Sequence, residues 1–248
     1  MDVVRLVVAA CLYCAAGAQA QVPDSGRWQE LRFDADLVAS DTEDRFIEKV
    51  VTLAAAGQLD EDHALLDRLH RIGASLVRAA IPLKPDVREW HWEFHTTSDP
   101  GIDALCMAGG KILIGSTFVR RLDLDDGELA TLLAHEVAHA VAEHHRELLS
   151  EALFLTGRAL PLDVVAERLD SDLGMQLRLA RLAAMQESEA DQLGMMLADR
   201  AGWPAGAMVA FYRKLAAQEQ DGALFGTHPA AASRLSMARG MARLFSAK

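Results

Sequence analysis

The chain has 248 residues, of which 51% are hydrophobic and 6% aromatic, and it carries a formal net charge of −11. This length is within the range of a single domain, and the apolar fraction is sufficient for a sizeable core. The acidic balance, with a sequence pI of about 5.2, gives no general attraction for a phosphate backbone, so we expect no nucleic-acid partner.

The first twenty residues have the pattern of a secretory signal peptide. Arg5 precedes an apolar run over residues 6–16, and Ala18-Gln19-Ala20 forms a small-x-small cleavage signature. A membrane anchor or a buried first helix is the competing interpretation, but the run is shorter than the roughly 20 residues that span a bilayer. We therefore expect cleavage after Ala20 and export to the periplasm.

The three cysteines bear on processing of the N-terminus and on disulfide formation. Residues 8–11 (Val-Ala-Ala-Cys) look like a lipoprotein processing box, so lipidation at Cys11 and membrane association through it form the alternative localisation. Cleavage after residue 20 would remove Cys11 and Cys14 and leave Cys106 as the only thiol, which permits no internal disulfide.

Most of the remaining chain is predicted to be helical. Residues 21–40 show no clear periodicity and are interpreted as a mature lead-in, and residues 41–248 as one catalytic domain. Apolar positions with helical spacing begin near Thr42 and stop at Gly57, and a second helix is expected over residues 65–77. Period-two alternation is confined to short stretches, which predicts an α+β fold that is mainly helical with a small sheet.

Two short segments are predicted to be strands of this sheet. Residues 90–95 alternate aromatic and polar side chains, and residues 111–115 (Lys-Ile-Leu-Ile-Gly) form a short apolar run after Gly109-Gly110. We expect residues 111–115 to be an edge strand, to which an extended peptide can add.

A predicted helix carries the residues that suggest metal chemistry. Asp125-Asp126-Gly127-Glu128 has the pattern of a capping box and precedes His135-Glu136-Val137-Ala138-His139. Because four residues advance an α-helix by little more than one turn, His135 and His139 can reach one metal ion. Glu136 lies between them and can act as a general base toward a water molecule.

A catalytic zinc site needs a third protein ligand. A helix expected over residues 172–201 contains Glu187 and Asp191, which are four apart and share a face. Glu187 can therefore bind the ion while Asp191 orients a ligand histidine. Glu189 is interpreted as part of a solvated acidic face.

Three motifs resemble those of a known peptidase family. They are His135-Glu136-x-x-His139, Glu187-x-Glu189-Ala190-Asp191, and Thr227-His228-Pro229 followed by Arg234. From about Asp41 to Leu235 the chain resembles the zincin-like gluzincin peptidases, which include HtpX, Oma-type proteases, CAAX prenyl proteases and the periplasmic BepA and LoiP. Residues 103–105 (Asp-Ala-Leu) stand where that family commonly has Asn-Ala-Phe.

The resemblance implies one Zn²⁺ per subunit. Its implied ligands are His135, His139 and Glu187, with Glu136 as the general base and Asp191 behind a ligand histidine. It further implies that His228 caps the metal at rest or assists the transition state, together with Arg234. We expect His144 and His145 to be structural or solvated, because three better-placed ligands exist.

The sequence therefore predicts a zinc-dependent endopeptidase that acts on extended or unfolded proteins. Resemblance to BepA and LoiP suggests envelope protein quality control, with outer-membrane assembly factors as partners. The main alternative is a catalytically quiet chaperone or adaptor that binds misfolded outer-membrane proteins, but the intact Glu136 argues against it. An integral-membrane protease is disfavoured because no long apolar run follows residue 20. Residues 148–172 receive no assigned role.

Overall fold

The computed structural model describes residues 18–219 and 231–247. Within them the chain is mainly helical with two small sheets, which confirms the predicted fold class. The elements are β1 (Ala18–Gln21), β2 (Trp28–Leu31), α1 (Ala35–Ala55), α2 (His63–Ala80), the 3-10 turn η1 (Pro85–Arg88), β3 (Glu93–Thr97), β4 (Ala104–Met107), β5 (Lys111–Gly115), α3 (Ser116–Arg121), α4 (Asp126–Val141), α5 (His144–Thr156), α6 (Leu162–Ser171), α7 (Leu173–Arg200), α8 (Ala205–Glu219) and α9 (Ala231–Ser246).

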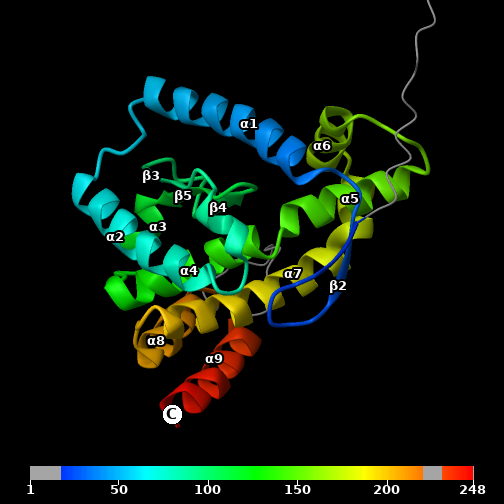
Figure 1. The fold of residues 1–248 in the computed structure, drawn as a ribbon. Coiled ribbons are helices and arrows are strands. Elements are labelled where there is room, and N and C mark those ends of the chain that lie inside the picture. The colour runs from blue at the N-terminus through cyan, green and yellow to red at the C-terminus, as the bar shows by residue number, and fades with distance from the viewer. Residues whose placement is uncertain (1–17, 220–230, 248) are drawn as a thin grey trace, which may run out of the picture.

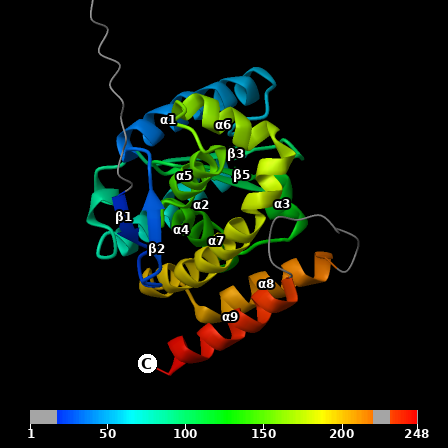
Figure 2. The same ribbon diagram turned by 90° about the vertical axis from the view of Figure 1, so that its right-hand side faces the viewer.

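Helix α4 lies at the centre of the molecule and packs against α2, α7 and α8. Helices α1 and α6 lie at one end and the α8–α9 pair lies at the other (Figures 1 and 2). The predicted capping box is present, since Asp125 accepts from the Glu128 amide and Glu128 accepts from the Asp125 amide. The first turn of α4 is thereby fixed in a helix that is buried at nearly every position.

Close contact between α4 and α7 depends on a glycine. A Cβ added at Gly194 of α7 would lie 2.9 Å from backbone atoms of Ala134 and His135 in α4. Only a residue without a side chain allows the two backbones to approach this closely. The approach positions the acidic residues of α7 beside the histidines of α4.

The three-stranded sheet corrects the expectation for residues 111–115. The strand order is β3-β5-β4, with β3 parallel and β4 antiparallel to β5, so β5 is the central strand and not an edge. All five of its residues are buried. A continuous apolar run is typical of a strand covered on both faces, and it does not reveal how many neighbours the strand has. The edge strand on the α4 side is β4, which the sequence pattern did not predict.

The other element boundaries differ from expectation by a few residues. Helix α1 begins at Ala35, earlier than Thr42, because the Asp34 carboxylate caps it by accepting from the amides of Asp36 and Leu37. Strand β3 begins at Glu93 and extends to Thr97, so the strand predicted over residues 90–95 is shifted toward the C-terminus.

Two further segments complete the fold. The hairpin β1–β2 lies beside α5 (Figure 2). Residues 148–172 form most of α5 and all of α6, whose buried side chains, including Leu149 and Val165, pack with Val38 and Met175 in a separate apolar cluster. Among the described residues, no helix is both long enough and apolar enough to cross a bilayer.

Candidate active site

The two helices α4 and α7 bring three metal-ligand side chains together. The Nε2 atoms of His135 and His139 lie 3.1 Å apart, and the Glu187 carboxylate oxygens lie 3.3 and 3.4 Å from them. Tetrahedral zinc with bonds of about 2.0–2.1 Å separates neighbouring ligand atoms by about 3.3–3.4 Å. The spacing and the chemistry of these donors therefore fit a zinc ion.

The charges around these donors also favour a cation. Burial disfavours protonated His135, but hydrogen bonds with Asp191 and Glu187 outweigh burial and raise the pKa of His135 to about 10. Burial also disfavours ionised Asp191, yet hydrogen bonds from His135 and Arg234 lower its pKa to about 2. The raised pKa of His135 reflects a negative potential at its imidazole, which a divalent ion can neutralise, and the lowered pKa of Asp191 keeps that carboxylate ionised.

Behind His135 lies a group of buried polar residues that we call the Asp191 arm: Asp191, Tyr212 and Arg234. The Nδ1 atom of His135 lies 2.9 Å from Asp191 Oδ1. Tyr212 donates to Asp191 at 2.7 Å, and Arg234 donates to both carboxylate oxygens at 2.6 and 2.7 Å. The arrangement places the Asp191 carboxylate where it can fix the orientation of the His135 ring.

Behind His139 lies a second group, the His144 arm: His144, Glu189 and Arg27. The Nδ1 atoms of His139 and His144 lie 3.0 Å apart. Nε2 of His144 lies 3.5 Å from a Glu189 oxygen, and Arg27 donates to both oxygens of Glu189 at 2.8 Å. Each ligand histidine thus has a polar partner behind it that leads to an arginine.

A sharp break between α4 and α5 brings His144 to His139. Glu143 connects the two helices in the left-handed conformation, with φ 54°, which an L-residue adopts at some cost. Lys84 and Arg146 pair with the Glu143 carboxylate at 2.9 and 2.8 Å and hold it in place. The turn at Glu143 directs His144 back toward the metal-ligand face.

The structure corrects the interpretation of Glu189 as a solvated residue. Its side chain is only 11% exposed, because the turn of the β1–β2 hairpin covers it. Burial would raise its pKa, but contacts with His144, Arg27 and Ser25 lower it to about 2. Arg27 comes from the lead-in segment, where no periodicity or motif marked a functional residue.

The remaining predicted residues fall in different places. Glu136 is buried and lines a cavity with His135, His139 and Glu187. Arg234 lines the same cavity and pairs with Asp191, whereas His228 lies outside the described residues. His144 is 2% exposed and therefore not solvated.

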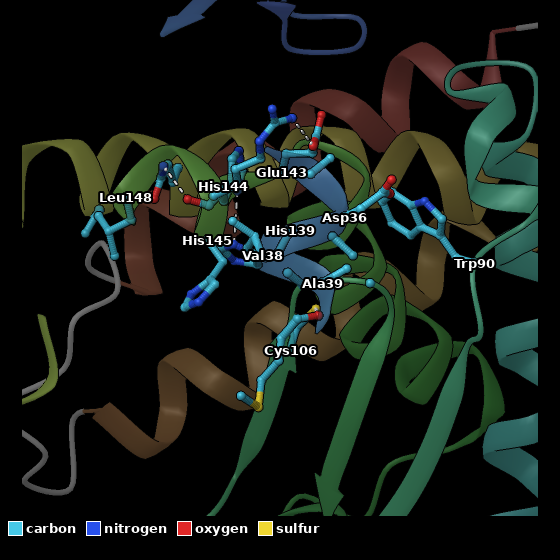
Figure 3. Close-up of a pocket in the computed structure, with 18 of the residues that line it drawn as sticks. Asp36, Val38, Ala39, Trp90, Cys106, His139, Glu143, His144, His145 and Leu148 are labelled. Atoms are coloured by element: carbon cyan, nitrogen blue, oxygen red, sulfur yellow. Dashed lines mark hydrogen bonds and ion pairs between the residues drawn. The ribbon is translucent and has the colours of Figure 1, made fainter. Parts of the chain in front are cut away.

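Two cavities meet at the metal-ligand residues. One, of about 330 Å³, extends between Trp90 and Leu148, with His139 and Cys106 between them (Figure 3). The other, of about 340 Å³, has an apolar wall of Phe118, Leu132, Phe211 and Leu215. His139, Glu187 and Cys106 line both cavities. Cys106 of strand β4 therefore lies where the two cavities meet, beside the candidate metal centre.

Two histidines from one helix and a glutamate from another meet beside an edge strand. This arrangement defines a metallopeptidase-type site. The model of Peptidase family M48 matches residues 64–242, and the chain belongs to this family. It is 33% identical over 154 residues to the mitochondrial metalloendopeptidase OMA1 of Schizosaccharomyces pombe, covering 58% of this chain and 44% of that protein.

Two further relatives match longer parts of the chain. OMA1 of Saccharomyces cerevisiae is 31% identical over 194 residues, which cover 71% of this chain and 56% of the relative. The beta-barrel assembly-enhancing protease of Escherichia coli K12 is 27% identical over 211 residues, with coverage of 77% and 41%. The chain thus spans about half the length of these curated relatives.

Proposed function

We propose that this protein is a zinc-dependent endopeptidase that hydrolyses peptide bonds in extended or unfolded proteins. The observation that carries the proposal is the convergence of His135, His139 and Glu187, with donor atoms 3.1–3.4 Å apart. Membership of Peptidase family M48 supports the same reaction class.

The proposed mechanism assigns separate roles to the residues around the scissile bond. Zinc bound by His135, His139 and Glu187 would polarise the substrate carbonyl and increase the acidity of water. Glu136 would accept a proton from the attacking water and deliver it to the leaving amine. Asp191 would keep the proton of His135 on Nδ1, and Arg234 would act through Asp191 by holding its carboxylate.

Strand β4 is the proposed docking edge for the substrate backbone. Among the described strands only β5 pairs with β4, so the other edge of β4 can accept an extended peptide. Ala104 to Cys106 line a cavity together with Glu136 and the three proposed ligands. Backbone pairing of this kind depends little on side chains, which suits substrates that are unfolded rather than defined by sequence.

Export and envelope quality control are part of the proposal. The signal-peptide pattern and the relative named as a beta-barrel assembly-enhancing protease support a periplasmic role with outer-membrane assembly factors. Cleavage after Ala20 would remove three of the four residues of β1 but leave β2 and Arg27 in the mature chain. Lipidation at Cys11 stays the alternative localisation, and a metal-capping role for His228 stays a proposal; both residues lie outside the described ranges.

The test replaces the proposed general base. Glu136→Gln keeps the size of the side chain but removes the proton acceptor, so we expect casein cleavage to fall by about 10²–10⁴-fold. Zinc content, measured by mass spectrometry, should stay near one ion per chain. A chelator should abolish cleavage by the wild-type protein, and added zinc should restore it.

The same assay separates the enzyme from the chaperone alternative. Unchanged cleavage by the Glu136→Gln variant would overturn the role of Glu136. A wild-type protein that suppresses aggregation of an unfolded substrate without cleaving it would instead favour the catalytically quiet chaperone or adaptor.

A further inference from the structure

The side of His139 that faces away from the candidate metal centre contacts the His144 arm. His139 Nε2 faces His135 and Glu187, whereas His139 Nδ1 faces His144 Nδ1 at 3.0 Å. A short contact between two imidazole nitrogens requires one of them to donate a proton and the other to accept it. The location of that proton decides whether His139 Nε2 has a free lone pair.

The Glu189 carboxylate decides which nitrogen carries the proton. It lies 3.5 Å from Nε2 of His144. A lone pair on this nitrogen would be repelled by the carboxylate, so neutral His144 carries its proton on Nε2 and accepts at Nδ1. His139 must then donate from Nδ1, which leaves its Nε2 lone pair directed at Glu187 and His135.

Glu189 is itself held from several sides. Arg27 donates to both of its carboxylate oxygens at 2.8 Å, and Ser25 donates at 3.0 Å. Arg27 also pairs with Glu147, which accepts from Gln186 at 2.8 Å. The carboxylate facing His144 is therefore fixed by a network that joins the β1–β2 turn, α5 and α7.

We propose that His144 and Glu189 are positioning residues that fix the ring and the protonated nitrogen of His139. This inference rests on the proposed zinc site and adds a set of residues that acts through His139, as Asp191 acts through His135. It also makes the turn at residues 25–27 a remote support of the metal centre, because Arg27 holds Glu189. Partners of this kind commonly affect metal affinity by 10–100-fold.

The test compares two replacements of His144 with a matched control. His144→Leu removes the acceptor, whereas His144→Asn places a side-chain oxygen near the position of Nδ1. His145→Asn serves as the control, because His145 is the next residue of α5 and, within the described part of the chain, makes no hydrogen bond or ion pair with a proposed ligand. Zinc affinity of each full-length protein is measured by competition with a chromophoric chelator.

We expect His144→Leu to weaken zinc binding about 10–100-fold, His144→Asn to recover part of that loss, and His145→Asn to bind as the wild type does. Equal affinity of the wild type and His144→Leu would overturn the inference. It would also be overturned if all three variants lost the same affinity, or if His144→Asn bound as weakly as His144→Leu.

A cobalt spectrum and a second variant test the inference independently of activity and of the folding of His144→Leu. The visible spectrum of the cobalt-loaded protein reports ligand geometry independently of activity, and His144→Leu should shift it while His145→Asn does not. If His144→Leu fails to fold, Glu189→Gln is measured instead and should also weaken zinc binding; wild-type affinity would contradict the inference. Failure of the wild-type protein to bind zinc would refute the proposed zinc site itself, a distinct outcome.

Discussion

The two ligand histidines of α4 are supported in different ways. Behind His135, one fully buried carboxylate, Asp191, lies 2.9 Å from the ring Nδ1 and accepts from Arg234 at 2.6 and 2.7 Å. Behind His139, the support passes through a second imidazole and a longer 3.5 Å contact to Glu189. The first arrangement is short and strongly paired, and the second is long and extends to the N-terminal hairpin. We therefore expect substitutions in the Asp191 arm to destabilise the protein more than substitutions in the His144 arm.

The largest effect is expected from Asp191→Ala. It leaves the guanidinium of Arg234 buried without its carboxylate and removes the acceptor behind His135. Loss of one partner of a buried ion pair typically costs about 3–5 kcal/mol of unfolding free energy, and zinc affinity should fall about 10–100-fold. Urea unfolding of the zinc-free protein measures the first effect, and chelator competition measures the second. A stability loss below that of Arg27→Met would reverse the expected order of the two arms.

A smaller effect is expected from Arg27→Met in the other arm. Arg27 is 21% exposed, so water can partly replace it beside Glu147 and Glu189. We expect a stability loss of about 1–3 kcal/mol.

The pH dependence of stability gives Arg27→Met a second readout. Burial would raise the pKa of Glu147, but hydrogen bonds from Arg27 and Gln186 lower it below its ordinary value of 4.5. The lowered pKa contributes stability above pH 4.5 that is lost as the pH falls through the folded-state value. Urea unfolding is measured between pH 3 and 6, approximately the range of ordinary carboxyl titration. The free energy of unfolding should fall less on acidification for Arg27→Met than for the wild type. Equal slopes would contradict the pairing.

The contrast between the arms also explains what the sequence could predict. The pairs His135–His139 and Glu187–Asp191 could be proposed from the sequence because helical spacing of four residues places two side chains on one face regardless of the rest of the fold. The capping box located the start of α4 for the same local reason.

The residues that escaped prediction depend on contacts between distant segments. Arg27 reaches Glu189 across 162 positions, and no local pattern encodes that pairing. His144 approaches His139 only because Glu143 adopts a left-handed conformation between two helices. Likewise, the apolar run of β5 indicated a buried strand, but its central position depends on β4, whose four residues carry little pattern of their own.

The most direct measurement compares Glu187→Gln with Glu189→Gln, two replacements of the same type two residues apart on α7. Zinc is titrated into each protein and into the wild type, with bound metal measured after dialysis. If Glu187 is the third ligand, the wild type retains one zinc ion per chain, Glu189→Gln retains it with weaker affinity, and Glu187→Gln loses it. Retention of zinc by Glu187→Gln with wild-type affinity would contradict the convergence of α4 and α7 on one metal ion.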